Sequence, residues 1–141
     1  MPPTAPIRSI LVVDDDVEIL RFLRETLTAF VACTVDTSPS SEYAFELALK
    51  KTYDLFIFDF TMPLVDGAVL YQFIRKVYLH DGRSPARLLP PMILLSGHGE
   101  QPRARELLHE PGVGGLLPKP FSIERLLSKV EACLPGAVTR K

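Results

Sequence analysis

Short apolar runs alternate along the chain with longer stretches that mix apolar and polar residues. Five runs contain uninterrupted apolar residues and predict strands buried on both faces of a sheet. They lie at Ile7–Val13, Val31–Val35, Leu55–Phe58, Met92–Leu95 and Leu116–Leu117. After each run, apolar residues recur at spacings of three and four, which predicts an amphipathic helix. Five such βα units in series predict an α/β fold, a doubly wound parallel sheet with helices on both faces.

The predicted helices are bounded by residues that commonly begin helices. Ser38-Pro39 offers an N-cap and a first-turn proline for the second helix, and Ser122 offers an N-cap for the fifth. The third helix follows Gly67, and the fourth spans Pro102–Glu110. The positions expected to face the core are Leu20, Leu23, Leu27 and Phe30, then Ala44, Leu47 and Ala48, then Leu70, Phe73, Ile74 and Val77, then Ala104, Leu107 and Leu108, and finally Ile123, Leu126, Leu127, Val130 and Leu134.

Composition favours one domain over residues 7–134, with short tails at 1–6 and 135–141. The chain has 141 residues, 47% hydrophobic and 23% charged, with a formal net charge of −1. Without a Lys/Arg block we expect no direct binding to nucleic acid or to a membrane. No signal peptide is visible, and no apolar run reaches the ~18–20 residues that span a bilayer. Cys33 and Cys133 show no metal-ligand spacing, so we expect free thiols and a cytoplasmic protein.

Polar residues follow four of the predicted strands. Asp14-Asp15 follows the first, Asp59 ends the third, Ser96 ends the fourth and Lys119 follows the fifth. In a doubly wound sheet the functional crevice lies beyond the carboxyl ends of the strands. If the first and third strands are neighbours, three carboxylates converge there, and their mutual repulsion requires a proton or a cation. A hard divalent ion such as Mg²⁺ fits oxygen ligands of this kind.

Four blocks of the sequence together resemble the signature of response-regulator receiver domains. They are Ile10–Asp16, Asp54–Gly67, Leu94–Gly97 and Leu117–Phe121, and the resemblance extends over roughly Ile7 to Leu134. It implies a flavodoxin-like, CheY-like fold with strand order 2-1-3-4-5. It also implies that the chain takes a phosphoryl group from a histidine kinase or histidine phosphotransfer protein and switches its contacts with other proteins.

The resemblance assigns roles to particular residues. Asp59 becomes the phosphoacceptor, a carboxylate nucleophile. Asp15 and Asp59 ligate Mg²⁺ directly, the backbone carbonyl of Thr61 is a third protein ligand, and Asp14 holds metal-bound water. Lys119 pairs with the phosphoryl oxygens. Ser96 donates its hydroxyl to one of them, and the Lys119–Pro120 peptide bond is cis.

Other polar residues have simpler interpretations. Asp16 is expected to be a helix N-cap, and Asp54 and Asp66 are expected to be turn or cap residues. Ser96 has the alternative role of capping the fourth helix. The three histidines, His80, His98 and His109, are expected at the surface rather than as metal ligands.

The chain departs from the family at two places. Leu116 stands three residues before Lys119, where receivers often carry a Tyr or Phe whose rotation reports phosphorylation. This departure puts an aromatic switch coupled to Ser96 in doubt. The stretch Val77–Pro91 is longer than usual and is expected to be an extended third helix plus a loop.

The pattern of residues fits four functions to different degrees. A receiver catalyses only its own Mg²⁺-dependent phosphorylation and dephosphorylation, and it acts on a downstream protein or a covalently linked domain. The face built from the fourth helix, fifth strand and fifth helix is the expected output surface and a surface for homodimers. A haloacid-dehalogenase-type phosphatase needs an acid where Thr61 stands. A nucleotide-binding domain needs a glycine-rich phosphate loop that is absent after the first strand. A receiver retained only for docking would not need the full set of site residues.

Overall fold

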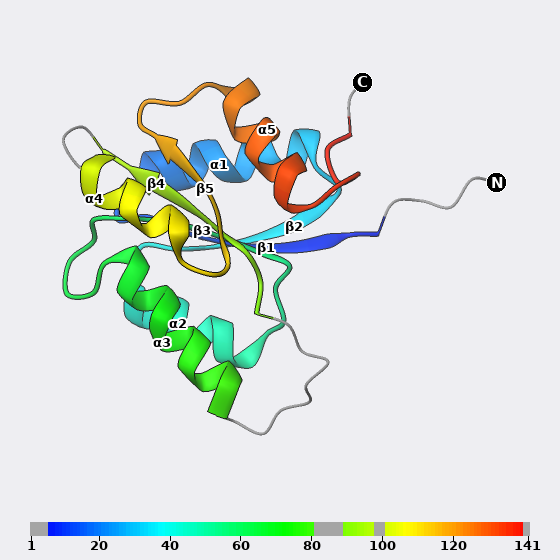
Figure 1. The fold of residues 1–141 in the computed structure, drawn as a ribbon. Helices are drawn as coiled ribbons and strands as arrows, with labels where there is room; N and C mark the ends of the chain where they lie inside the picture. Colours follow the sequence, from blue (N-terminus) through cyan, green and yellow to red (C-terminus); the bar gives the residue numbers. More distant parts are fainter. Residues whose placement is uncertain (1–5, 81–88, 98–100, 140–141) are drawn as a thin grey trace.

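The computed structural model describes residues 6–80, 89–97 and 101–139, in which helices and strands alternate along the chain (Figure 1). The strands are β1 (Arg8–Val13), β2 (Cys33–Ser38), β3 (Leu55–Asp59), β4 (Met92–Ser96) and β5 (Val113–Pro118). The helices are α1 (Val17–Phe30), α2 (Ser41–Lys50), α3 (Gly67–His80), α4 (Gln101–Glu106) and α5 (Ile123–Cys133), and a 3₁₀ turn, η1 (Leu107–His109), follows α4.

The five strands form one sheet in the order β2-β1-β3-β4-β5, and every pairing between neighbours is parallel. The strand order reverses between β1 and β3, where such sheets place their functional crevice. Helices α1 and α5 lie on one face of the sheet, and α2 and α3 lie on the other (Figure 1). The predicted doubly wound fold with order 2-1-3-4-5 is therefore confirmed.

The core consists of two layers, because successive side chains of a strand point to opposite faces. Leu11 and Val13 of β1 pack with the helices α2, α3 and α4, whereas Ile10 and Val12 pack with α1 and α5. Every residue of β3 and β4 is buried. These central strands are therefore fully covered on both faces, as their continuous apolar runs predict.

The second strand lies further along the chain than predicted, and the helix after it has a different cap. β2 starts at Cys33 rather than Val31, because its pairing with β1 runs from Arg8–Cys33 to Val13–Ser38. Val31 instead forms an isolated antiparallel bridge with Val138. Ser38 is thereby drawn into the strand, and Ser40 caps α2 by accepting a hydrogen bond from the Tyr43 backbone N–H. The predicted Ser38-Pro39 start was wrong.

The region from the fourth helix to the fifth strand also differs from the prediction. α4 ends at Glu106, and the rest of the predicted helix tightens into η1. β5 is longer than the predicted pair of leucines because Gly114 and Gly115 belong to it. A side chain at Gly114 would meet the Cys133 sulfur, and one at Gly115 would meet Lys129. These glycines therefore let α5 pack closely against the strand.

Four of the predicted inward positions are exposed. Phe73, Leu108, Ile123 and Phe30 keep between 37% and 46% of their side-chain surface exposed. Phe30 is the last residue of α1 and Ile123 is the first residue of α5. In α3 the inward aromatic residue is Tyr71, whose hydroxyl donates to the Pro90 carbonyl at 2.9 Å. The buried face of α3 therefore includes Tyr71 and not Phe73, in contrast to the prediction.

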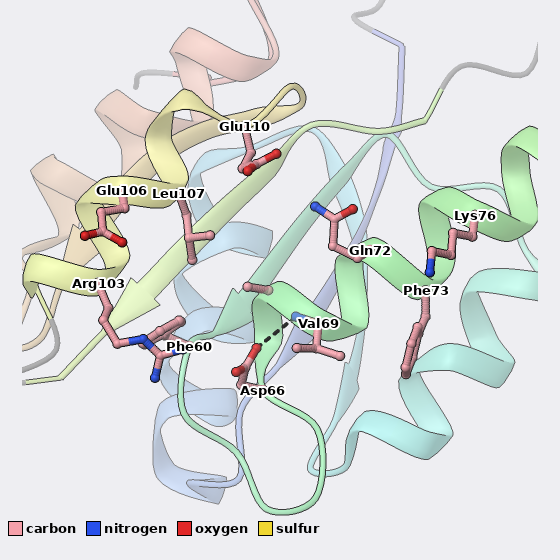
Figure 2. Close-up of a pocket in the computed structure, with 11 residues that line it drawn as sticks. Phe60, Asp66, Val69, Gln72, Phe73, Lys76, Arg103, Glu106, Leu107 and Glu110 are labelled. Atoms are coloured by element: carbon pink, nitrogen blue, oxygen red, sulfur yellow. Dashed lines mark hydrogen bonds between the residues drawn. The ribbon is translucent and has the colours of Figure 1, made fainter.

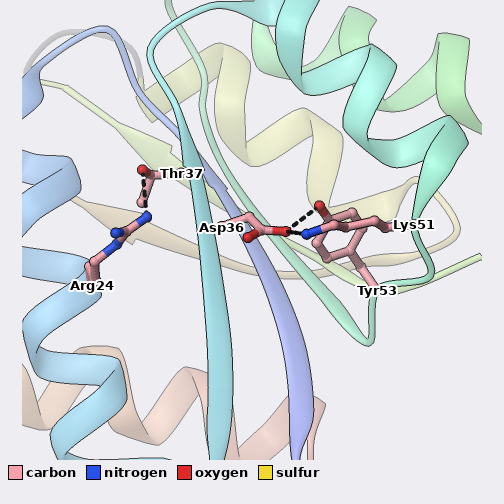
Figure 3. Close-up of polar contacts among 5 residues, drawn as sticks. All are labelled: Arg24, Asp36, Thr37, Lys51 and Tyr53. Carbon is pink, nitrogen blue, oxygen red and sulfur yellow. Dashed lines mark hydrogen bonds and ion pairs between the residues drawn. The ribbon is translucent and has the colours of Figure 1, made fainter.

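A polar cluster joins β2 to the segment between α2 and β3 (Figure 3). The Asp36 carboxylate accepts hydrogen bonds from the Lys51 ammonium at 2.9 Å and from the Tyr53 hydroxyl at 2.7 Å. These two hydrogen bonds lower the pKa of Asp36, although burial acts in the opposite direction. On the other side of β2, Arg24 donates to the Thr37 hydroxyl at 3.1 Å. Since β2 is an edge strand, charged side chains flank both sides of the exposed sheet edge.

The residues after α5 pack back onto the domain. The Ala32 backbone N–H donates to the Ala137 carbonyl at 3.1 Å, and Ala137 is buried. The Glu131 carboxylate accepts from the backbone N–H groups of Gly136 and Val138. Residues 135–139 are therefore hydrogen-bonded to the connection between α1 and β2.

The cysteines and the Lys119–Pro120 bond have the states that the sequence predicts. Cys33 and Cys133 are free, half-buried thiols, and the Lys119–Pro120 bond is cis, as predicted. His109 is exposed, as predicted, whereas His98, residues 1–5 and 81–88 and the last two residues of the chain lie outside the described residues. Within the described ranges, no helix combines the length and apolarity needed to cross a membrane.

Candidate functional site

The first acidic residues lie in the turn between β1 and α1, which is fixed by local hydrogen bonds. Asp14 is fully buried, its backbone N–H donates to the Ser38 carbonyl, and its carboxylate accepts from the Asp16 N–H at 2.9 Å. Asp16 caps α1 by accepting from the Glu18 N–H, which confirms its predicted role. Asp15, between them, is exposed. The turn thus presents one buried and one accessible carboxylate at the same strand end.

Asp59 is the last residue of β3 and is also buried, with 4% of its surface exposed. Its position depends on Gly67, the first residue of α3, because any side chain there would collide with the Asp59 carbonyl. The Gly67 N–H donates to the Phe60 carbonyl at 3.0 Å. In the Asp66-Gly67 pair, the glycine therefore lets the start of α3 pack closely against the end of β3. The Asp66 part of the prediction is confirmed, since Asp66 caps α3 through the Val69 N–H.

The loop between Asp59 and α3 carries one strained residue. Leu64 has a φ of 71° and is 87% exposed, and the Val65 N–H donates to the Pro63 carbonyl across it. This hydrogen bond over a central residue of positive φ describes a γ-turn of the rarer, strained kind. The Ser41 hydroxyl holds the far end of the loop by donating to the Val65 carbonyl at 2.6 Å. Thr61, two residues after Asp59, is exposed.

The three carboxylates come together as the strand ends predicted. One oxygen from each of Asp14, Asp15 and Asp59 can be chosen so that all lie within 4.8 Å of one another. Lys119 reaches the same place from the end of β5. Its ammonium lies 2.8 Å from an Asp14 oxygen and 3.2 Å from an Asp59 oxygen. Three acids and one ammonium therefore share a small crevice at the carboxyl edge of the sheet.

Burial and charge shift the ionisation of this cluster. Burial, reinforced by the negative charge of Asp14, raises the pKa of Asp59 to about 6. Burial also raises the pKa of Asp14, although its hydrogen bond from Lys119 opposes the rise. For Lys119, burial lowers the pKa, but the two carboxylates outweigh that effect and raise it overall. The cluster therefore has three acidic groups and only one cationic group, and its carboxylate oxygens can hold a metal ion.

Ser96 ends β4 beside these groups. It is fully buried, and its hydroxyl has no hydrogen-bond partner within the described residues. Its carbonyl accepts from the Lys119 N–H at 2.7 Å, so the ends of β4 and β5 are held together. Ser96 lies five residues before α4 and does not cap it. Leu116 is buried against β4 in the layer that α2, α3 and α4 cover.

Residues 10–131 match the profile described as the response regulator receiver domain. The chain belongs to this family. Its relatives include the response regulator ArlR of Staphylococcus epidermidis, with 29% identity over 89% of this chain and 52% of ArlR. The transcriptional regulatory protein ResD of Bacillus subtilis is 31% identical over 91% of this chain and 48% of ResD. The receiver chain thus spans about half the length of these relatives.

Solved receiver structures are similar to this chain over about nine tenths of its length. A response regulator receiver domain protein from Clostridium thermocellum superposes with a TM-score of 0.74 and 26% identity over 90% of this chain and 94% of the other. The chemotaxis protein CheY4 of Vibrio cholerae gives 0.75 and 25% over 92% and 100%. This receiver domain of two-component signalling has its acidic pocket at Asp14, Asp15 and Asp59.

The sequence did not point to every long-range contact in the fold. Asp54 was expected to be a turn or cap residue, but its carboxylate accepts from the Ser9 N–H, 45 residues away, at 2.7 Å. The Arg103 guanidinium lies over the Phe60 ring, 5.3 Å from its centre. Both contacts join segments far apart in the chain, and no local spacing signals them. The strand-end pattern placed Ser96 at the crevice, and the resemblance to the family gave it a role toward the phosphoryl group.

Proposed function

We propose that Asp59 is the phosphoacceptor and that Lys119 and Ser96 act on the phosphoryl group. The observation that carries this proposal is the position of the Lys119 ammonium, which contacts both Asp14 and Asp59. A cation fixed beside a buried carboxylate neutralises charge that phosphorylation adds. The Ser96 hydroxyl, unpartnered within the described residues, is free to donate to a phosphoryl oxygen.

The same proposal includes the metal. Asp15 and Asp59 would ligate Mg²⁺, with the Thr61 carbonyl as a third protein ligand and Asp14 holding metal-bound water. The all-oxygen donor set fits this hard ion better than a softer metal. When bound, Mg²⁺ supplies positive charge against the acidic pocket and the phosphoryl oxygens.

In the reaction, the Asp59 carboxylate oxygen attacks phosphorus of a phosphohistidine. The new O–P bond forms as the P–N bond breaks, and the imidazole leaves with the bonding electrons and is protonated by solvent. Lys119 remains paired to the added negative charge. The receiver turns over no metabolite, and it catalyses only its own phosphorylation and hydrolysis.

The proposed phosphodonor is a histidine kinase or a histidine phosphotransfer protein in the cytoplasm. An apolar groove of about 370 Å³ beside Lys119 supports this partner. Ile19 and Phe22 of α1 and Phe121 line it, and the two phenylalanine rings lie 6.0 Å apart. A helical donor packed there would hold its histidine near Asp59. The output goes to a downstream protein or linked domain, and the face formed by α4, β5 and α5 is the proposed surface for it and for a homodimer.

A small-molecule phosphodonor tests the chemistry without knowledge of the kinase. With Mg²⁺ and acetyl phosphate, the wild-type chain should gain one base-labile phosphate, detected by intact-mass spectrometry, and it should bind beryllofluoride. Asp59→Asn should do neither, and excess EDTA should abolish both signals in the wild type.

Asp16→Asn is the matched control, because it also removes an acid next to the pocket while asparagine caps a helix as well as aspartate does. It should be labelled like the wild type. A wild-type chain that stays unlabelled with Mg²⁺ present, or label that persists in Asp59→Asn, would refute the assignment of Asp59.

A further inference from the structure

A second groove lies between α3 and the α4–η1 segment, and Phe60, the residue after Asp59, lines it (Figure 2). Its volume is about 580 Å³. Figure 2 shows Arg103 and Leu107 of α4–η1, and Glu110 just after η1, on one side of the groove, and Val69 and Gln72 of α3 on the other. The phosphorylation chemistry proposed above uses none of these side chains.

Apolar side chains are exposed along this groove. Val69 and Phe73, one turn apart on α3, are 39% and 46% exposed, and Leu107 on the facing wall is half-buried. Phe60 is buried beneath the Arg103 guanidinium. Exposed apolar residues that line one groove mark a contact site more strongly than the same residues scattered singly. The groove therefore offers an apolar strip to a partner.

The rim beside this strip is acidic on the α4–η1 side. Glu106 and Glu110 are exposed, and neither carboxylate forms an ion pair with another residue in the described part of the chain. Arg103, the arginine of α4 that lines the groove, has its guanidinium stacked on Phe60. Lys76 stands on the α3 side. A partner with positive charge beside its apolar face would complement the two glutamates.

We propose that this groove binds an amphipathic helix of a partner protein, with its apolar face on Val69, Phe73 and Leu107 and its Lys or Arg side chains against Glu106 and Glu110. A helix is the expected occupant because both walls of the groove are helical, and a third helix can pack its ridges between them. An extended strand would require an open sheet edge, which this groove lacks. The proposal goes beyond the phosphoacceptor function and holds for the unphosphorylated chain.

The test uses the full 141-residue chain, labelled with ¹⁵N, and a designed probe. The probe is an 18-residue helical peptide whose leucines recur at spacings of three and four and are flanked on one side by lysines. A second peptide carries glutamate at each lysine position. The lysine peptide should shift the amide signals of α3, α4 and η1, and the glutamate peptide should bind at least about fivefold more weakly.

Reversing the charges of Glu106 and Glu110 should make the groove bind the glutamate peptide more tightly than the lysine peptide. The double variant Glu106→Lys with Glu110→Lys should weaken the lysine peptide about fivefold to tenfold and strengthen the glutamate peptide. Glu46→Lys, an exposed glutamate on α2 outside the groove, is the matched control and should leave both affinities unchanged. Val69→Asp should weaken both peptides, since it places a charge on the apolar strip.

Three outcomes would overturn the proposal. They are equal binding of the two peptides, shifts confined to residues outside α3, α4 and η1, and no effect of the rim reversal. Acetyl phosphate labelling of Asp59 is measured separately on the same samples. Failure of the groove proposal and failure of the phosphoacceptor proposal therefore give different results.

Discussion

Two serines with opposite hydrogen-bonding states end strands of the sheet. Ser38 ends β2 and Ser96 ends β4, and both are fully buried. The Ser38 hydroxyl donates to the Ser40 carbonyl at 2.7 Å and accepts from the Ser40 N–H at 3.2 Å. The Ser96 hydroxyl has no partner among the described residues. Because a buried hydroxyl without a partner destabilises the folded state, its retention at Ser96 points to a role in another state of the site.

We predict that Ser96→Ala leaves the free energy of unfolding unchanged within about 0.5 kcal/mol, or raises it, whereas Ser38→Ala lowers it by about 1–2 kcal/mol. Urea denaturation of both variants measures the difference. Ser96→Ala should also weaken beryllofluoride binding by about tenfold, because the hydroxyl no longer donates to the phosphoryl analogue. A Ser96 variant as destabilised as the Ser38 variant would show that the hydroxyl serves the fold instead.

The sequence predicted those site residues that stand at the end of an apolar run. Asp14, Asp59 and Lys119 each follow or end an apolar run, and parallel strands bring such ends to one edge. The Phe60–Arg103 stack could not be predicted in this way. It depends on the packing of α4 against the loop after β3, which no spacing within either segment encodes.

At the scale of elements, the edge strand β2 is tied to its neighbours by charge as well as by pairing. Asp36 holds Lys51, which follows α2, and Tyr53, which precedes β3 (Figure 3). Tyr53 is buried, and burial together with Asp36 raises the pKa of its hydroxyl, which therefore stays protonated and donates. The two contacts connect strand, helix end and next strand through one carboxylate.

We predict that Asp36→Asn lowers the free energy of unfolding by about 1 kcal/mol at pH 7, a modest amount because Lys51 is more than half exposed. The folded pKa of Asp36 lies below its unfolded value of about 4. The stabilisation from its charge is therefore complete above the unfolded pKa and is lost as pH falls through the folded pKa.

Urea denaturation should be measured at pH 7 and at pH 3. The difference in the free energy of unfolding between wild type and Asp36→Asn should be smaller at pH 3. Glu46→Gln, on the exposed face of α2, should show no such gap at either pH. A gap of the same size at both pH values would contradict a charge effect.

The elements themselves could largely be predicted, and their boundaries less well. Helical periodicity located all five predicted helices, because each has a buried face. It placed four exposed residues inside: Phe30 and Ile123 at helix ends, Phe73 in α3 and Leu108 in η1. β5 was underestimated because Gly114 and Gly115 carry no apolar side chain to signal a strand. These glycines allow the close approach of α5, which is a tertiary contact that the local sequence does not reveal.

At the scale of the whole molecule, residues 135–139 add an anchor beyond the last helix. Ala137 is buried, Val138 bridges to Val31, and the Thr139 N–H donates to the Phe30 carbonyl at 2.7 Å. Glu131 accepts hydrogen bonds from two backbone N–H groups of this segment. The anchor thus connects the end of α5 to the end of α1.

We predict that deleting residues 135–141 lowers the free energy of unfolding by about 2 kcal/mol, from lost apolar burial and lost backbone hydrogen bonds. Glu131→Gln, which keeps the acceptor but removes the charge, should lose less, about 0.5–1 kcal/mol. Thermal unfolding with both variants measures the two effects. A deletion with no effect would show that the anchor contributes nothing to stability.

The two described ends of the chain meet at one residue. The Arg8 N–H donates to the Ala32 carbonyl at 2.9 Å, and the Ala32 N–H donates to the Ala137 carbonyl. This meeting point lies at the opposite end of the strands from Asp59. The ends could accordingly be joined by a short linker and the chain reopened in a surface loop, or the whole unit could be inserted into a loop of a host protein. In either arrangement the crevice would still face solvent, so the unit can serve as a transplantable phosphorylation module.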